Sequence, residues 1–357
     1  MRAFVMFGGL MHKSAPHPQP SSRRLKLVAL PRKPGFSTGE YLIAWLEGRR
    51  SLRPSTRVSY EMHLRRYLLP HLGEVPLAEL DTARVDAMYE RLLTEPVNGR
   101  RLNPATVRRI HATLMSALGH AVRCGLLDRN PAEFVDLPRA AASKVQVWSL
   151  DELTFFLRGS ANDWLHPLFL LLAMTGVRRG EAIGLRWVDV DLERAEIRVV
   201  QQIVAVGART YLGAPKSSNG RRTVAVPDQL ARALAGHRSR QRRARLAAVP
   251  GWIDSGLVFT TADGEALNPY AVSRRFDHLV AELGLPVIRL HDLRHTSASL
   301  GLASGETLLE VSRRLGHSSI TITADVYAHV APVTAHQSAQ RLGELILPTQ
   351  LNRTEAT

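Results

Sequence analysis

The sequence predicts an α+β protein that is mostly helical and has two domains. A length of 357 residues is enough for two domains of about 100–200 residues each. Apolar residues recur at helical spacing through most of the chain, whereas the alternation typical of strands is confined to residues 197–226. We therefore expect an N-terminal helical domain and a second domain that combines helices with a small sheet.

The charge balance favours a polyanionic partner. The chain has 47 Lys and Arg against 32 Asp and Glu, a formal charge of +15. A membrane surface is a weaker candidate, because the mean hydropathy is −0.09 and no 18-residue uncharged apolar run occurs. We expect a cytoplasmic protein that binds nucleic acid and no membrane.

Cys124 is the single cysteine, which excludes an intrachain disulfide and a cysteine cluster for zinc. A reducing compartment suits such a chain. We expect the thiol to pack beside a helix as a small apolar group.

The first domain is predicted at 36–139, after a basic arm at 1–35 that contains no acidic residue. The arm is either a solvated tail or a DNA contact. Four helices are expected in 36–139, each with a capping residue or a proline at its start. These start signals are Ser37 with Glu40, Pro54, Asp81, and Asn103 with Pro104.

The second domain is predicted at 145–347, with a linker at 140–144 and a tail at 348–357. Ser149 and Glu152 form a second capping box. One strand is expected to contain Ile197, Val199 and Ile203, and another Thr223, Val224 and Val226, with a turn at 215–220 between strands. The arginine-rich stretch 238–245 is interpreted as the solvated face of a helix.

Several polar residues of this domain have an ordinary interpretation when taken singly. Arg178 alone is typical of a surface ion pair, Lys216 of a turn, and His317 of a helix start. Together they suggest more, because metal-free phosphodiester cleavage needs fixed cations, a nucleophile in line and an acid for the leaving oxygen.

Five segments in this order resemble the conserved boxes of the tyrosine recombinase (phage integrase) family. The boxes span 175–329, and the helical region before them resembles the family's core-type DNA-binding domain. The segments are TGVRRGE at 175–181 with GLRW at 184–187, PK at 215–216 before RRTV at 221–224, HDLRHT at 291–296, LGHSS at 315–319, and TADVYAH at 323–329.

The resemblance implies a site-specific DNA recombinase that integrates or excises a mobile element. Its catalytic domain would contain a small antiparallel sheet. Tyr327 would attack a scissile phosphate and form a 3′-phosphotyrosyl link, which the 5′-hydroxyl of a partner strand then attacks. Bond energy is conserved in this exchange, so we expect neither a metal nor a nucleotide cofactor.

Arg178 and Arg294 would bind the transition state, because guanidinium groups offer planar donor forks and remain charged. His291 lies three residues before Arg294 on one helical face and is a candidate proton acceptor for Tyr327. The resemblance assigns Lys216 as general acid, His317 as a phosphate donor and Glu181 as the support of an arginine. We expect His295 to pack or to support the site.

Alternatives remain open at this stage. His291 and His295 have the spacing of paired metal ligands, but the metalloprotease pattern requires glutamate after the first histidine and no third ligand is evident. Tyr327 could be a core tyrosine. The whole chain could also be a DNA-binding regulator, an inactive recombinase relative, a chromosome-dimer resolvase or a related topoisomerase.

The partners expected from the resemblance are double-stranded recombination sites, other protomers in a homotetramer, and accessory directionality or host bending factors. An apolar stripe at Ala335, Ala339, Leu342 and Ile346 predicts a last helix. This helix would dock either on its own domain or on a neighbouring protomer. Two departures from the family pattern, at 301–306 and at Ile322, concern helix packing.

Overall fold

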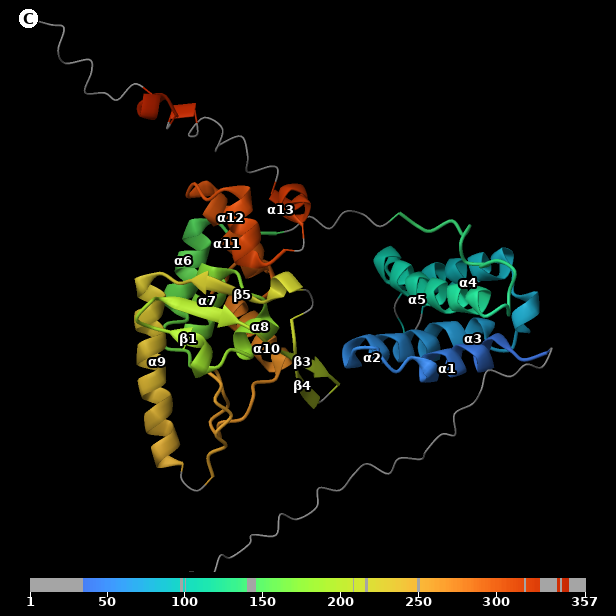
Figure 1. Cartoon of the computed structure of the whole chain (residues 1–357), viewed down its shortest axis with the longest axis horizontal. Coiled ribbons are helices and arrows are strands. Elements are labelled where there is room, and N and C mark those ends of the chain that lie inside the picture. Colours follow the sequence, from blue (N-terminus) through green and yellow to red (C-terminus); the bar gives the residue numbers. More distant parts are fainter. Residues whose placement is uncertain are drawn as a thin grey trace, which may run out of the picture. The chain divides into compact units, whose positions relative to one another are not determined.

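A computed structural model gives the structure of the chain, which divides into two compact units between residues 141 and 142 (Figure 1). It describes residues 35–96, 99, 101–139, 146–207, 209–215, 218–248, 251–317, 319–327, 339–340 and 342–346. Residues 1–34 of the predicted arm, the linker and the C-terminal tail lie outside these residues. Within the described residues, no helix combines the length and apolarity that crossing a membrane requires.

The N-terminal unit is helical, as predicted. Ser37 and Glu40 form the expected capping box, and the side chains of Asp81 and Asn103 each accept a backbone N–H at 2.8 Å. Its elements are α1 (Thr38–Gly48), α2 (Pro54–His63), the π-helix η1 (Leu64–Leu68), α3 (Leu69–Leu72), the 3₁₀-helix η2 (Leu77–Glu79), α4 (Thr82–Thr94) and α5 (Pro104–Arg123).

The apolar stripes of these helices form one core. Val85 in α4 and Ile110 in α5 are fully buried, as their helical spacing predicts. Leu64 and Leu68 are buried as well, although the π-helix η1 interrupts the α-helical register there. The expectation for Cys124 is wrong: the residue caps the end of α5 and is exposed, because the chain turns away from the core at that point.

The second unit combines helices with small sheets. Helix α7 lies in its interior and contacts α9 and α11. Phe169 of α7 packs in tilted or edge-to-face contacts within a cluster of four aromatic rings, which also includes Trp148, Phe156 and Phe276. The helices are α6 (Leu150–Gly159), α7 (His166–Thr175), α8 (Arg179–Ile183), α9 (Asp228–Ala247), α10 (Pro269–Glu282), α11 (Asp292–Ala303), α12 (Leu308–Leu315) and α13 (Ile320–Tyr327).

Both sheets are antiparallel. Strands β1 (Val190–Asp191), β2 (Glu196–Val199) and β5 (Arg222–Ala225) pair in the order β1-β2-β5, with Ile197 opposite Val224. Strands β3 (Gln202–Val206) and β4 (Arg209–Gly213) form a separate hairpin.

The prediction of a single strand through Ile197, Val199 and Ile203 is therefore wrong. Ile203 belongs to β3, which leaves the three-stranded sheet and lies against α8 instead. Gly180 and Gly184 permit this approach, because a Cβ on Gly180 would lie 2.7 Å from the carbonyl oxygen of Ile203.

Candidate active site

The first site segment joins α7 to α8. Gly176 ends α7 in the left-handed conformation with φ 63°, which glycine adopts without strain. Arg178 then caps α8, and its backbone N–H and its Nη1 both donate to the carboxylate of Glu181, at 3.0 and 2.9 Å. The side chain of Arg178 is 30% exposed, so a ligand can reach its remaining donors.

Glu181 holds a second arginine from the sheet. Nη2 of Arg222 lies 3.0 Å from Oε2 of Glu181, and both side chains are buried. Burial opposes ionisation of this carboxyl, but the charges of Arg222 and Arg178 outweigh it and hold the pKa of Glu181 below its usual value. Glu181 is therefore an anion between two cations.

Two further arginines connect α11 and α12 to this segment. Arg294 is buried, and its Nη1 and Nη2 donate to the carbonyl oxygens of Gly176 and Leu315 at 2.7 and 2.8 Å. Arg314 donates to the carbonyl of Thr175 at 3.2 Å and pairs with Glu306 at 2.8 Å. Guanidinium groups thus connect the α7–α8 segment, α11 and α12.

His291 lies at the start of α11, three residues before Arg294. Part of its surface is exposed. Desolvation by the surrounding protein is nevertheless the largest cause that lowers its pKa to about 4, and the charge of Arg294 is the next. Its ring meets that of His295 edge-on, with centroids 5.7 Å apart. At neutral pH His291 is therefore uncharged, and one of its ring nitrogens can accept a hydrogen bond.

His317 follows Gly316, which ends α12 with φ 69°. Its Nδ1 lies 2.8 Å from Oγ1 of Thr323 in α13, and the side chain of Asn219 donates to its carbonyl at 3.3 Å. Burial, followed by the charges of Arg294 and Arg178, lowers the pKa of His317 to about 4. Nε2 is the ring nitrogen left to meet a ligand.

The structure brings Arg178, Glu181, His291, Arg294 and His317 into one region. Tyr327 is the last residue of α13, one helical turn after Thr323, and its side chain lies outside the described residues. Lys216 also lies outside them, between the end of β4 and the 3₁₀-helix η4 (Ser218–Gly220).

Sequence reasoning missed three residues of this network. Arg222 was included only in the RRTV segment at 221–224 and Asn219 only in the predicted turn at 215–220, while Arg314 was not singled out at all. Because Asn219 contacts the His317 segment, the chain that bears Lys216 continues directly into the site. Arg222 has the clearest signal, since it follows the hairpin lysine within one of the five boxes.

The region can bind an anion through fixed donors. Its four guanidinium groups are held by carboxylates and backbone carbonyls, so little side-chain reorganisation is needed when a phosphate arrives. Among the residues that the structure describes, no group of His, Cys, Asp and Glu forms a metal site.

Comparisons with family models identify the family of the chain. Residues 150–333 match the model of the Phage integrase family, and residues 38–93 match the Phage integrase, N-terminal SAM-like domain. The chain belongs to the phage integrase family. It is a site-specific tyrosine recombinase, an enzyme that cuts and rejoins DNA.

Two curated integrase-family relatives cover most of the chain. A tyrosine recombinase XerC-like protein of Caldanaerobacter subterraneus subsp. tengcongensis is 30% identical over 87% of this chain and 83% of its own. The integrase of Mycobacterium phage FRAT1 is 28% identical, over 91% and 92% of the two chains.

Solved integrase structures share the fold. The Tn1549 transposon integrase, solved with a circular intermediate DNA, superposes with a TM-score of 0.73 at 21% identity, over 86% of this chain and 99% of that one. Lambda integrase, solved as a dimer on a core site, gives 0.61 at 17% identity, over 82% and 77%. The mostly helical fold with small antiparallel sheets is thus confirmed.

Proposed function

We propose that Tyr327 is the nucleophile of this recombinase and that Arg178 and Arg294 bind the scissile phosphate. The tyrosine oxygen attacks phosphorus, the bond to the 5′-oxygen breaks, and a 3′-phosphotyrosyl link forms. The strongest support is the hydrogen bond between His317 and Thr323, which lies one helical turn before Tyr327. This bond connects the arginine cluster to the helix that contains the proposed nucleophile.

The proton transfers follow from the chemistry of the neighbours. A phenol with a pKa near ~10 needs a base at neutral pH, and uncharged His291 accepts its proton. Lys216 protonates the leaving 5′-oxygen, and His317 donates to a nonbridging oxygen. Glu181 supports Arg178. In the second half of the reaction a 5′-hydroxyl attacks the phosphotyrosyl link, with the same groups acting in reverse.

We further propose that the substrate is a recombination site of a mobile element, in the cytoplasm, and that a homotetramer performs the exchange. Integrase relatives of phages support the first statement. A lambda integrase structure is a tetramer bound to a Holliday junction. Directionality or host bending factors would assist.

The predicted last helix supports an assembly role. Residues 339–340 and 342–346 are helical, and Leu342, Leu345 and Ile346 are 57%, 78% and 65% exposed. Ala335 lies outside the described residues. An exposed apolar helical segment of this kind is a candidate contact with a neighbouring protomer, so we propose docking in trans.

The variant Tyr327→Phe tests the nucleophile. On a nicked suicide substrate it should form no covalent adduct, while the dissociation constant for the site stays within about twofold, because no phosphate donor is removed. Denaturing gels report the adduct, and native mass measurement of the uncleaved complex counts protomers.

Tyr211→Phe in the β3–β4 hairpin is the matched control and should cleave normally. A covalent adduct formed by the Tyr327→Phe protein would overturn the assignment. A complex that never exceeds two protomers on a full pair of sites would overturn the tetramer.

A further inference from the structure

Helix α9 carries a charge that the active site does not use. Its only acidic residue, Asp228, is at its first position, and five arginines follow in its outer half. Those arginines are exposed, as expected of a solvated helix, and they are Arg238, Arg240, Arg242, Arg243 and Arg245.

The helix is anchored to its unit along one narrow strip. The side chain of Gln241 accepts from the indole N–H of Trp187 at 2.6 Å and donates to the carbonyl of Val258 at 3.1 Å. Arg245 pairs with Asp254 at 2.9 Å. These contacts fix the rotation of α9 about its axis, and so fix where its other arginines point.

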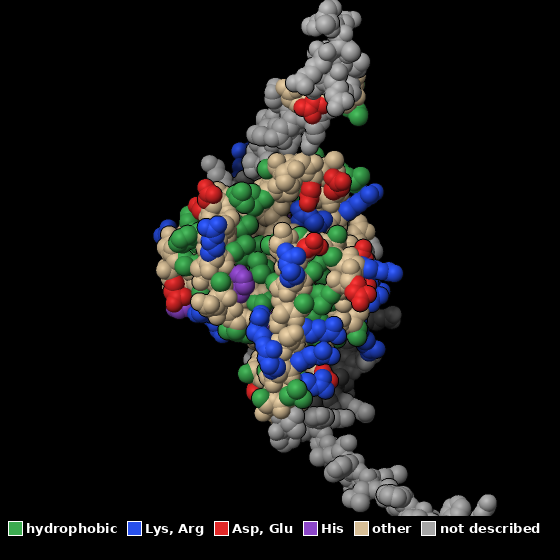
Figure 2. All heavy atoms as spheres, turned by 90° about the vertical axis from the view of Figure 1, so that its left-hand side faces the viewer, with side chains coloured by type: hydrophobic (Ala, Val, Ile, Leu, Met, Phe, Trp, Pro, Cys, Tyr) green, Lys and Arg blue, Asp and Glu red, His purple; other side chains and the backbone are tan. Residues whose placement is uncertain are grey.

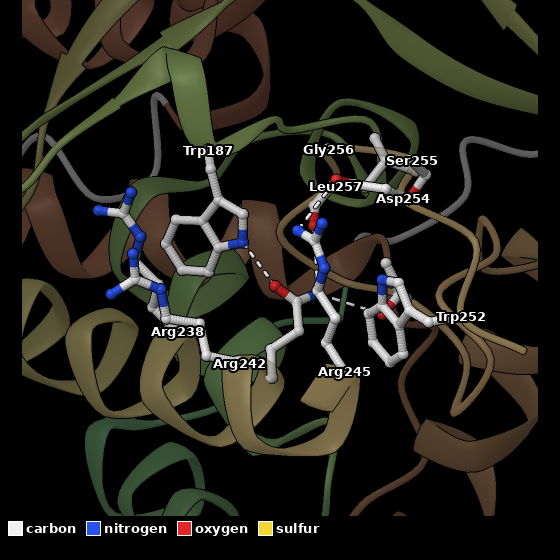
Figure 3. Close-up of a pocket in the computed structure, with 11 residues that line it drawn as sticks. Trp187, Arg238, Arg242, Arg245, Trp252, Asp254, Ser255, Gly256 and Leu257 are labelled. Atoms are coloured by element: carbon white, nitrogen blue, oxygen red, sulfur yellow. Dashed lines mark hydrogen bonds and ion pairs between the residues drawn. The ribbon is translucent and has the colours of Figure 1, made fainter. Parts of the chain in front are cut away.

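The anchored strip has arginines on both flanks. Arg238 and Arg242 line a pocket beside Trp187, and the guanidinium of Arg238 lies over the indole at 5.3 Å (Figure 3). Arg240 lines a second hollow on the opposite flank, together with Trp164. Helical spacing directs Arg243 outward between the two.

These cations form no ion pair in the described part of the chain, although Arg238 also lines a hollow that contains Asp189, Asp191, Glu193 and Glu196. The pocket contains one carboxylate, Asp254, which is paired with Arg245. No described carboxylate lies within ion-pair distance of Arg238, Arg240, Arg242 or Arg243. A surface of this kind attracts an anion with charges spaced along its length.

The position of α9 separates this surface from the active site. In Figure 1 its outer half extends along the edge of the second unit, away from α13. Figure 2 faces that side and shows basic side chains gathered along its lower part. DNA that is bound at Arg178 would reach the surface of α9 only through duplex beyond the core site.

We propose that the outer half of α9 and the pocket beside Trp187 form a second DNA contact, which binds the phosphate backbone of duplex that flanks the core recombination site. Cations on both flanks and on the outer face suit two phosphate backbones that pass on either side of a helix. An acidic polypeptide would instead need apolar anchor positions on one face, and the outer half of α9 offers only Leu246.

The test compares two duplexes, a core site alone and the same core with flanks, each titrated at several salt concentrations. The variant is Arg240→Gln/Arg242→Gln/Arg243→Gln, and the control is the corresponding triple lysine variant, which keeps the charge. Wild type should bind the flanked duplex more tightly and with a steeper salt dependence.

The glutamine variant should lose this advantage. We expect its affinity for the flanked duplex to fall on the order of tenfold and its salt slope to fall by about 2–3, since each phosphate contact contributes about 0.9. The lysine control should bind almost as wild type does.

Cleavage of the short core should stay unchanged in both variants, so failure of this inference is distinguishable from failure of the proposed chemistry. Equal affinity of wild type and glutamine variant for the flanked duplex would overturn the inference. Poly-glutamate is titrated as a third ligand, and a loss confined to its binding would also overturn the inference, because the surface would then take an acidic polypeptide.

Discussion

The second unit contains two clusters of arginines, which differ in their exposure and in their hydrogen-bond partners. In the active site, Arg178, Arg222, Arg294 and Arg314 each donate to a carboxylate or a backbone carbonyl of another segment. On α9, Arg240, Arg242 and Arg243 are exposed and have no carboxylate partner among the described residues.

Because of this difference, we expect the first cluster to act in catalysis and the second in DNA affinity. A guanidinium that the fold already holds in place stabilises the charge of a transition state without reorganising, because its dipoles and hydrogen bonds are set before the substrate arrives. A solvated guanidinium contributes chiefly through counterion release, which depends on salt and not on fine geometry. Substitutions in the two clusters should therefore affect different measurements.

The largest expected effect is on cleavage by Arg178→Ala and Arg294→Ala. Each removes one preorganised donor, so the single-turnover cleavage rate should fall by about 10²–10³. Binding at moderate salt should change far less. The α9 glutamine variant provides the contrast, with normal cleavage of the core. If all three proteins lost cleavage equally, the division between the clusters would be wrong.

A smaller effect is expected from Arg222→Gln, which leaves the buried Glu181 with one arginine fewer. Breaking such a buried pair typically removes about 3–5 kcal/mol of stability. Urea unfolding should report the loss, and cleavage should fall because Arg178 is less well held. The double variant Arg222→Gln/Glu181→Gln should lose less unfolding free energy than the two single variants lose together. Simple additivity would show that the pair is not coupled.

The smallest effect concerns pH. The pKa of His317 is about 4 in the folded chain, against about 6.5 when unfolded. Between these values the unfolded chain binds more protons, so stability falls as pH drops from about 6.5 to about 4. His317→Gln should make this fall shallower in thermal unfolding scans. An unchanged pH profile would show that protonation of His317 is not linked to folding.

The sequence predicted the N-terminal unit better than the site. Caps such as Ser37 and the apolar stripes of α4, with Val85, and of α5, with Ile110, are local patterns that the sequence near each helix determines almost alone. The separation of β3 from β2 was missed because it depends on Gly180 and Gly184 meeting a distant strand. The five sequence segments of the site were recognised, but the contacts that connect them in the fold were not.

That connection depends on contacts across long sequence separations. Arg222 reaches the carbonyl of Arg314 at 2.7 Å, over 92 residues. No spacing rule within a helix or a strand indicates such a bond, and a backbone carbonyl leaves no trace in residue identity. The depressed pKa of His291 likewise requires the folded surroundings, although its three-residue distance from Arg294 was visible beforehand.

The exposed position of Cys124 has a practical consequence. As the single cysteine of the sequence, it gives each chain one thiol that a maleimide dye can reach, in the N-terminal unit and outside the arginine cluster. One fluorophore per protomer turns photobleaching steps into a count of chains on a single DNA molecule. The second unit contains no thiol at all, so labelling chemistry leaves the candidate site untouched.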